Sequence, residues 1–331
     1  MRPRVGRLVL WGLAVLGVVV TLFVVADVRA TGASLRAFDW WQLPAVVGFT
    51  LLNYVLRWLK WDWYLRRMRM REGVSTADSA LLFTSGMAMA VTPGKAGEVS
   101  KSFLLRRLNG TPVSASAPVV LAERFTDGLA MLLLAAIGLA VYPAIRPLFV
   151  VLALGALAMV VVLRHGVLFD RALALVAKAP IARRAGGGLE AARASTRSLF
   201  AWPVLELSTA LSVASWFGEC VAFAFVLVGL GEPLSAETLL LATFIFAAST
   251  LIGLVSLLPG GLGASEISSA GLLVLLLPMD AGPAAAATLL IRICTLWFGV
   301  ALGFGALAVM LRRLGRPPAG VATPAEAGVE G

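Results

Sequence analysis

Long apolar runs separated by short clusters of arginine form the main pattern along this chain. An α-helix rises about 1.5 Å per residue, so a run of about twenty apolar residues is long enough to cross a hydrocarbon core about 30 Å thick. The first run follows three arginines and is predicted to be a retained signal anchor. Six runs are predicted to be full membrane spans: residues 8–26, 43–65, 113–142, 148–163, 204–230 and 283–311.

Two further apolar stretches, residues 80–108 and 239–277, are each interrupted by a Pro-Gly break. Pro-Gly steps end helices and form turns, so each stretch is predicted to be a re-entrant hairpin that enters and leaves the membrane on one side. The predicted fold class is all-α, a polytopic membrane helical bundle of about six full spans plus these two hairpins. Two full crossings in place of either hairpin would leave the topology of the other spans unchanged.

The two breaks share the pattern P-G-x-x-G, and a carboxylate follows each of them, Glu98 in the first and Glu266 in the second. Arg124 follows the first break at nearly the same spacing at which Arg292 follows the second. Three predicted crossings separate corresponding points, and an odd number of crossings inverts the second copy. The chain is therefore predicted to contain an inverted repeat with broken helices in corresponding places. The alternative is that P-G-x-x-G is turn chemistry alone.

This repeat divides the chain into five predicted segments. They are a signal anchor and external loop (1–42), a first repeat with hairpin 80–108 (43–164), a cytoplasmic amphipathic linker (165–202), a second repeat with hairpin 239–277 (203–311), and a disordered cytoplasmic tail (312–331). In the linker, leucines such as Leu189 and Leu199 indicate helices that lie on the membrane surface. A solvated linker is the alternative.

The distribution of basic residues orients these spans. By our count 20 of the 28 lysines and arginines fall in the segments that this layout places in the cytoplasm. Only Arg29, Arg36 and Arg146 fall in external loops. Basic residues favour the cytoplasmic side, so both termini are predicted to be cytoplasmic.

The composition excludes several classes of protein. The chain is 60% hydrophobic and 14% charged, with a mean hydropathy of +0.91, which does not suit a soluble enzyme, a nucleic-acid-binding module or a disordered chain. The net charge of +10 comes mostly from clusters between apolar runs, so it indicates contact with anionic lipid rather than with nucleic acid. One histidine and two separate cysteines predict no metal site, no cofactor and no catalytic Cys/His pair.

A charged side chain inside the membrane needs a partner or a function. Arg124 and Asp127 are spaced to pair on one helix face, whereas Glu123 competes with Asp127 for the same cation. Lys95 is the expected second cation. The expected partner of Arg292 lies across helices, at Glu266 or Glu219. Arg57 and Lys60 are expected to extend to the cytoplasmic interface. The alternative is that all these charges form internal salt bridges that only stabilise the fold.

The functional interpretation uses the helix that restarts after each break. Its free N–H groups and positive dipole end attract an anion, and glycines let the anion approach the backbone. The predicted substrate-binding residues are Lys95, Arg124, Arg292, Gly94, Gly97, Gly260, Gly261 and Gly263, which together suit a phosphate headgroup. The predicted counter-ions or proton carriers are Glu98, Glu123, Asp127, Glu266 and Glu219.

Several of these motifs resemble one known family. Thr92-Pro93-Gly94-Lys95-Ala96-Gly97-Glu98, Glu123-Arg124-Phe125-Thr126-Asp127 and Leu258-Pro259-Gly260-Gly261-Leu262-Gly263 are similar to the lysylphosphatidylglycerol synthetase transmembrane-region family, also described as flippase-like integral membrane proteins. The resemblance extends over most of residues 8–311. It implies a bacterial inner-membrane protein and lipid translocation. The best-understood members also carry a soluble aminoacyl-transferase domain after the membrane part, and we expect this chain to be without it.

Three functions follow from these observations. The first is translocation of an anionic phospholipid or a polyprenyl-linked lipid, with a mid-membrane phosphate site and no catalytic residue. The second is an accessory membrane subunit for a separate glycosyltransferase or aminoacyl-transferase. The third is an enzyme acting on a lipid headgroup through Glu98, Glu123 and Asp127, which lacks a motif for an activated donor. The sequence indicates neither the headgroup nor the oligomeric state.

Overall fold

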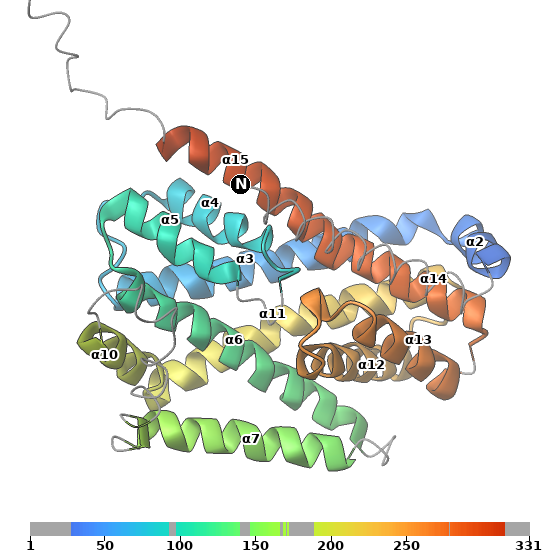
Figure 1. Ribbon diagram of the computed structural model, residues 1–331. Coiled ribbons are helices and arrows are strands. Elements are labelled where there is room, and N and C mark those ends of the chain that lie inside the picture. The colour runs from blue at the N-terminus through green and yellow to red at the C-terminus, as the bar shows by residue number, and fades with distance from the viewer. Residues whose placement is uncertain are drawn as a thin grey trace, which may run out of the picture.

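The computed structural model describes residues 28–92, 97–139, 146–165, 168–169, 171, 189–277 and 279–314, and all regular structure in these ranges is helical (Figure 1). Within these ranges, four helical stretches are long and apolar enough to cross a membrane: Trp202–Gly229, Ala236–Val255, Pro259–Leu276 and Ala281–Leu314. The expected all-α membrane bundle is therefore confirmed. The predicted signal anchor, the last part of the tail and most of the predicted linker lie outside the described residues.

The first part of the chain forms α2 (Val28–Ala37), α3 (Leu43–Arg67), α4 (Thr76–Met87), α5 (Ser100–Asn109), α6 (Val113–Ala136) and α7 (Arg146–Arg164). Local sequence sets these limits. Pro44 lies in the first turn of α3, where its missing N–H costs nothing, and the Ser75 side chain accepts a hydrogen bond from the backbone N–H of Asp78 to cap α4. Gly110 ends α5 in a left-handed conformation. Helix α2 lies in the segment expected to be an external loop.

The second part forms α10 (Leu189–Leu199), α11 (Trp202–Gly229), α12 (Ala236–Val255), α13 (Ala264–Leu276), α14 (Ala281–Arg292) and α15 (Phe298–Leu314). A π-helical stretch, Ile293–Trp297, joins α14 to α15 and directly follows Arg292. Helix α10 packs against α6 and α11, and Leu199 at its end is buried. The amphipathic helix predicted in the linker therefore lies on the protein, where its apolar face is covered by the bundle.

The two predicted hairpins differ in length. Helices α4 and α5 have 12 and 10 residues, about 18 and 15 Å, which suits a segment that enters the membrane only part of the way. Helix α12 has 20 residues, about 30 Å, so this arm of the second hairpin has the length of a full span. In both hairpins a glycine brings the arms together: a Cβ on Gly86 would lie 2.7 Å from Lys101 Cδ, and one on Gly253 would collide with Ser265 Oγ.

Helices from the two parts of the chain interleave. The most extensive contact joins α3 to α11. Helix α4 packs against α15, and α12 packs against α6. Helix α2 packs against α14, and α10 packs against α6. Helices of one part thus pack against helices of the other part, as Figure 1 shows for α6 and α12.

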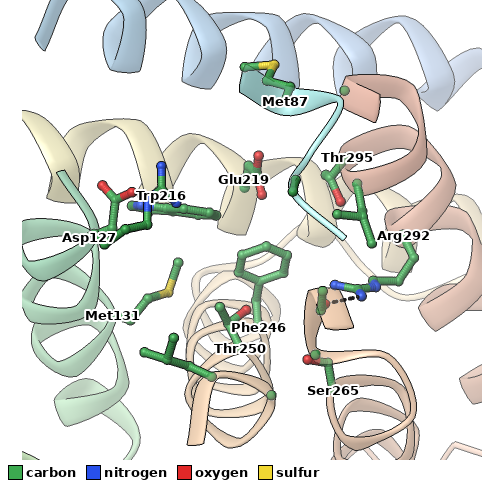
Figure 2. A pocket seen from close by; sticks show the side chains of 18 of the residues that line it. Met87, Asp127, Met131, Trp216, Glu219, Phe246, Thr250, Ser265, Arg292 and Thr295 are labelled. Carbon is green, nitrogen blue, oxygen red and sulfur yellow. Dashed lines mark hydrogen bonds and ion pairs between the residues drawn. The ribbon is translucent and has the colours of Figure 1, made fainter. Parts of the chain in front are cut away.

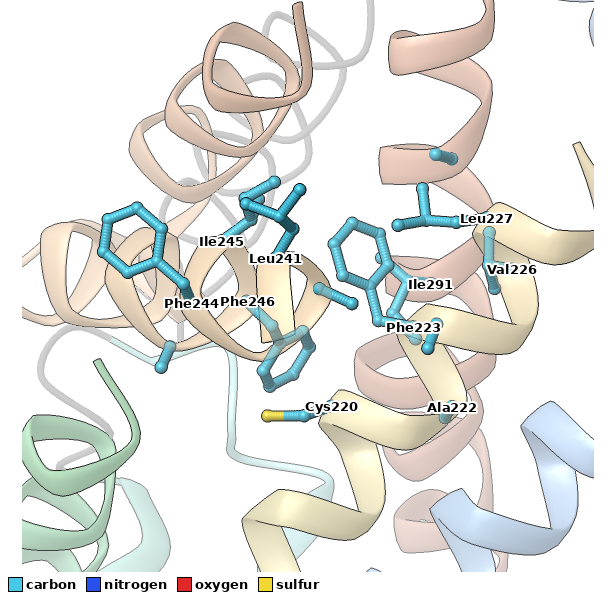
Figure 3. Close-up of a cluster of buried hydrophobic side chains, with 14 of the residues drawn as sticks. Cys220, Ala222, Phe223, Val226, Leu227, Leu241, Phe244, Ile245, Phe246 and Ile291 are labelled. Atoms are coloured by element: carbon cyan, nitrogen blue, oxygen red, sulfur yellow. The ribbon is translucent and has the colours of Figure 1, made fainter. Parts of the chain in front are cut away.

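The core consists of two apolar clusters. One gathers α11, α12, α14 and the end of α6, where Phe223, Phe244 and Ile245 are buried (Figure 3). The other gathers α3, α4, α5, α10 and the start of α6, around Trp61 and Leu82. Along α6 and α11 the residues between the two clusters are polar and buried, namely Glu123, Thr126, Asp127, Ser208, Ser212 and Ser215. A polar layer therefore crosses the interior of the bundle.

Candidate functional site

The two Pro-Gly breaks meet in this interior. A Cβ added to Gly260 would lie 3.3 Å from Val91 Cγ1, and Val91 stands just before the first break. Gly260, Gly261 and Gly263 have φ values of 61°, 68° and 87°, a region that residues with a side chain rarely adopt. The glycine-rich sequence of the second break is thus required by its backbone. Gly94 and Lys95 of the first break lie outside the described residues.

Each break is joined to a later helix by an arginine–glutamate ion pair. Arg124 Nη2 lies 3.0 Å from Glu98 Oε2, and Arg292 Nε lies 2.5 Å from Glu266 Oε1. In both pairs the arginine follows its glutamate at the same spacing along the chain. Arg292 Nη2 also donates to the carbonyl oxygen of Gly260, at 2.9 Å. Of the two partners expected for Arg292, the structure places Glu266 against it.

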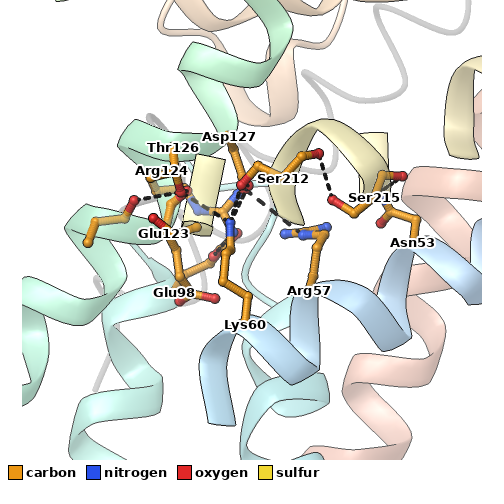
Figure 4. Close-up of polar contacts among 12 residues, drawn as sticks. Asn53, Arg57, Lys60, Glu98, Glu123, Arg124, Thr126, Asp127, Ser212 and Ser215 are labelled. Carbon is orange, nitrogen blue, oxygen red and sulfur yellow. Dashed lines mark hydrogen bonds and ion pairs between the residues drawn. The ribbon is translucent and has the colours of Figure 1, made fainter. Parts of the chain in front are cut away.

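Around Arg124 the ion pair extends into a buried network (Figure 4). Asp127 lies 3.3 Å from Arg124, 2.7 Å from Lys60 and 4.0 Å from Arg57. Lys60 also donates to Ser212 Oγ at 2.6 Å. The expectation that Arg57 and Lys60 extend to the interface was wrong. The Lys60 side chain is 1% exposed, because the carboxylate of Asp127 and hydroxyl groups on α6 and α11 hold its ammonium inside.

A second buried pair supports the same network. Lys101 Nζ lies 2.6 Å from Glu123 Oε2, and both side chains are 1% exposed. The Lys101 ammonium also lies 4.4 Å from the ring centre of Trp61 and 5.3 Å from that of Phe83, within the range of cation–π attraction. Lys60 and Lys101 are thus further cations of this network among the described residues, whereas Lys95, the expected second cation, lies outside them. One signal in the sequence pointed to Lys101, namely its place one helical turn after Glu98.

A cavity of about 190 Å³ lies between the two parts of the chain (Figure 2). Arg124 and Asp127 line it from α6, Glu219 from α11, and Arg292 from α14. The Arg124 and Arg292 side chains are 18% and 20% exposed, and both line the cavity, although Arg124 Nε and Nη2 and Arg292 Nε are buried. Further lining residues are Tyr54, Arg57, Glu98, Lys101, Trp216, Phe246, Gly260 and Gly261. The sequence-predicted site residues from both breaks therefore meet at one cavity.

Among the described residues, two of the backbone N–H groups expected to bind an anion already have side-chain acceptors. The Gly97 N–H donates to Thr92 Oγ1 at 2.8 Å, and the Gly263 N–H donates to Glu266 Oε2 at 2.7 Å. A buried N–H requires an acceptor, and a nearby side chain supplies one at each break. Gly260 presents its carbonyl oxygen to Arg292. In this structure the guanidinium groups, rather than these two N–H groups, are the donors available to an anion.

Known proteins similar to the chain agree with this architecture. The family described as "Lysylphosphatidylglycerol synthase TM region" matches residues 9–303, so the chain belongs to that family. A relative described as a UPF0104 membrane protein, from Methanothermobacter thermautotrophicus, is 28% identical over 290 residues. This match covers 80% of the chain and 82% of the relative. The expected resemblance and the assignment to multi-pass membrane proteins are therefore confirmed.

Proposed function

We propose that this member of the lysylphosphatidylglycerol synthase TM region family moves an anionic lipid between the two leaflets of a membrane. The phosphate of the lipid headgroup would bind between Arg124 and Arg292. One observation carries the proposal: these two arginines, each paired with the glutamate that follows its break, line the same cavity. Lys95, next to the first break, would add a third cation.

The chemistry of arginine suits this role. A guanidinium group presents five N–H donors in a planar fork that matches phosphate, and it stays charged when buried. Arg292 uses Nε for Glu266 and Nη2 for Gly260, which leaves further donors for a ligand. Glu98 and Glu266 would hold the arginines when no lipid is bound. An arriving phosphate would then replace one charged partner with another, so that no cation becomes unpaired inside the membrane.

The packing of the helices supports an inverted repeat. The contact between α4 and α15 corresponds to the contact between α12 and α6. In the same way, the contact between α2 and α14 corresponds to the contact between α10 and α6. The most extensive contact, α3 with α11, joins two helices that occupy the same place in the order of the two halves. Two inverted halves around one central site allow the site to open to either leaflet in turn. The clusters of basic residues favour a protein with both termini in the cytoplasm, and the family resemblance implies the inner membrane of a bacterium.

The test is a flux measurement in liposomes that contain the purified full-length protein. The probe is phosphatidylglycerol with a fluorescent acyl chain, and the readout is its exchange between leaflets. Arg292→Ala should slow exchange about 10- to 100-fold, because a charge-assisted hydrogen bond contributes about 1.5–3 kcal/mol. Arg313→Ala is the matched control. It removes an arginine that is 50% exposed and pairs with Asp78 away from the cavity.

The rival functions predict different results. Exchange by the wild-type protein without chemical change of the lipid supports the translocase. A new lipid product would indicate an enzyme. A wild-type protein that exchanges no lipid, or an Arg292→Ala variant that exchanges lipid at the wild-type rate, would contradict the proposal. A wild-type protein that exchanges no lipid would favour the accessory-subunit function, with a separate transferase as partner.

A further inference from the structure

Three leucines beside the second break both line the cavity and reach the outer surface. Leu254, Leu257 and Leu258 are 47%, 69% and 45% exposed, and all three border the cavity that holds Arg292. Gly260, whose carbonyl binds Arg292, follows shortly after Leu258. The cavity is therefore open at its side through an apolar rim, and this rim adjoins a phosphate-binding guanidinium group.

The predicted hairpin layout places the rim at the depth of the hydrocarbon core. In that layout α4 enters the membrane from one face, and its 12 residues reach only about 18 Å, so the break that follows it stops inside the bilayer. Val91, at this break, packs against Gly260 of the second break, so the second break lies at the same depth. The three exposed leucines next to it consequently face lipid chains and not water.

The cavity itself is too small to enclose a whole lipid. Sites that enclose a ligand of ordinary drug size have about 300–1,000 Å³, and this cavity has about 190 Å³. A phosphate headgroup fits that space, whereas its hydrocarbon chains do not. Leu257 also has a φ of 53°, a left-handed conformation that is strained for a leucine and persists only where the surroundings impose it. The fold thus holds an apolar side chain outward at the side of a charged cavity.

We propose that Leu254, Leu257 and Leu258 form a lateral opening, through which the hydrocarbon chains of the bound lipid extend into the bilayer while its phosphate lies between the arginines. This inference rests on the proposed function and specifies its substrate. The transported ligand is a phosphate-headed lipid whose chains stay in the membrane, whereas a water-soluble phosphate ester can occupy only the headgroup site. The opening lies on the α12–α13 side of the cavity.

The experiment narrows the opening without changing a charge. Leu257→Trp and, as a second variant, Leu254→Trp are compared with Leu275→Trp, since Leu275 is a 58% exposed leucine of α13 that does not border the cavity. Two quantities are measured for each folded variant in liposomes or detergent. One is the exchange of phosphatidylglycerol between leaflets, and the other is the binding of radiolabelled glycerol phosphate, which has the headgroup but no chains.

We expect the two rim variants to exchange lipid about tenfold more slowly than the wild-type protein, because the chains lose their path. Their binding of glycerol phosphate should stay within about twofold of the wild-type value. Leu275→Trp should change neither quantity. Arg292→Ala, in contrast, should lose both, because it removes the group that binds the phosphate.

These results separate the opening from the translocase. If both rim variants exchange lipid at the wild-type rate while Arg292→Ala does not, the opening is wrong and the proposed function stands. If the rim variants also lose the binding of glycerol phosphate, the leucines contribute to the headgroup site, and the proposal of a lateral opening is again wrong. If Arg292→Ala exchanges lipid normally, the proposed function itself fails.

Discussion

The surroundings of the two arginine–glutamate pairs differ far more than the pairs themselves. Arg124 with Glu98 and Arg292 with Glu266 have the same spacing, and both arginines line one cavity. Around Arg124, however, the structure places five further charged side chains within one network, namely Arg57, Lys60, Lys101, Glu123 and Asp127. Besides Glu266, the contact described for Arg292 is the hydrogen bond to the carbonyl of Gly260, and Glu219 lines the same cavity.

Corresponding positions make the difference concrete. At the offset along the chain that relates the two pairs, Lys101 corresponds to Ser269, Glu123 to Ile291 and Asp127 to Thr295. Ser269, the counterpart of Lys101, accepts a hydrogen bond from the hydroxyl of Thr288 at 3.4 Å, and the counterpart of Glu123 is the uncharged Ile291. The feature common to both halves is therefore the arginine with its glutamate. Among the described residues, the larger network belongs to the first half.

This comparison assigns different roles to the charges. A buried ion pair contributes little net stability, but the loss of one partner costs about 3–5 kcal/mol because the other charge is left unpaired. The charges of the first half must therefore be kept together for folding. The less crowded pair of the second half is easier to separate, which suits an arginine that exchanges its partner for a ligand.

The largest effect on folding is expected for Lys101→Met. This change leaves the Glu123 carboxylate, 1% exposed, without its partner at 2.6 Å. The free energy of unfolding, measured by denaturation in mixed detergent micelles, should fall by about 3–5 kcal/mol. The double variant Lys101→Met/Glu123→Ile, which adopts the residue found at position 291, should recover most of that loss. A double variant as unstable as the single one would show that the lysine stem, not the charge, supports the packing.

The next prediction distinguishes the role of Arg124 from that of Arg292. Arg124→Ala and Arg292→Ala should slow lipid exchange to a similar extent, about 10- to 100-fold, because both contact the same cavity. Arg292→Ala should also lower the free energy of unfolding by several kcal/mol, since it removes the cation described beside the buried carboxylate of Glu266. Arg124→Ala should lower it less, because Asp127 keeps Lys60 at 2.7 Å and Glu98 keeps Lys101 at 4.0 Å. Measuring exchange and unfolding on the same preparations tests both statements. Equal destabilisation by the two variants would remove the difference drawn between the halves.

The sequence predicted the fold well where local patterns decide it. Apolar runs and Pro-Gly breaks indicated the helices that became α3, α6, α7, α11 and α14–α15, and the two hairpins. Even so, α3 and α6 are not among the four helical stretches that are apolar enough to cross a membrane, because charged side chains lie within both of them. Their charges are hidden by tertiary contacts, which hydropathy does not record.

The site was predictable in part, for the same reason. Nearly equal spacing after the two breaks singled out Arg124 and Arg292, and a glutamate follows each break, although the partner expected for Arg124 was Asp127 rather than Glu98. The partners of Lys60 could not be found in this way, because Ser212 lies 152 residues away and meets Lys60 only through the packing of α3 on α11. The sequence predicted free backbone N–H groups at the breaks. Whether such a group is free depends on side-chain rotamers, and the side chains of Thr92 and Glu266 accept hydrogen bonds from the N–H groups of Gly97 and Gly263.

A smaller effect is expected at the contact between the breaks. Gly260→Ala places a Cβ 3.3 Å from Val91 at a φ of 61°, which should cost about 1–2 kcal/mol of unfolding free energy. Gly271→Ala on α13 is the control, because a Cβ there meets no atom within 4 Å and alanine favours a helix. The control should be neutral or slightly stabilising. No difference between the two variants would mean that the breaks do not rely on their contact.

The smallest effect is expected where α4 of the first half meets α15 of the second. Asp78 Oδ1 lies 2.8 Å from Arg313 Nη1, but the arginine is 50% exposed, so water screens the pair. The corresponding contact of α12, with the short helix Ile137–Leu139 that follows α6, is apolar, with Phe244 against Gly138. Because the second junction needs no ion pair, Asp78→Asn should lower the free energy of unfolding by less than about 1 kcal/mol, as measured in the same detergent assay. A loss as large as that of Lys101→Met would mean that surface charge, and not the buried network, distinguishes the first half from the second.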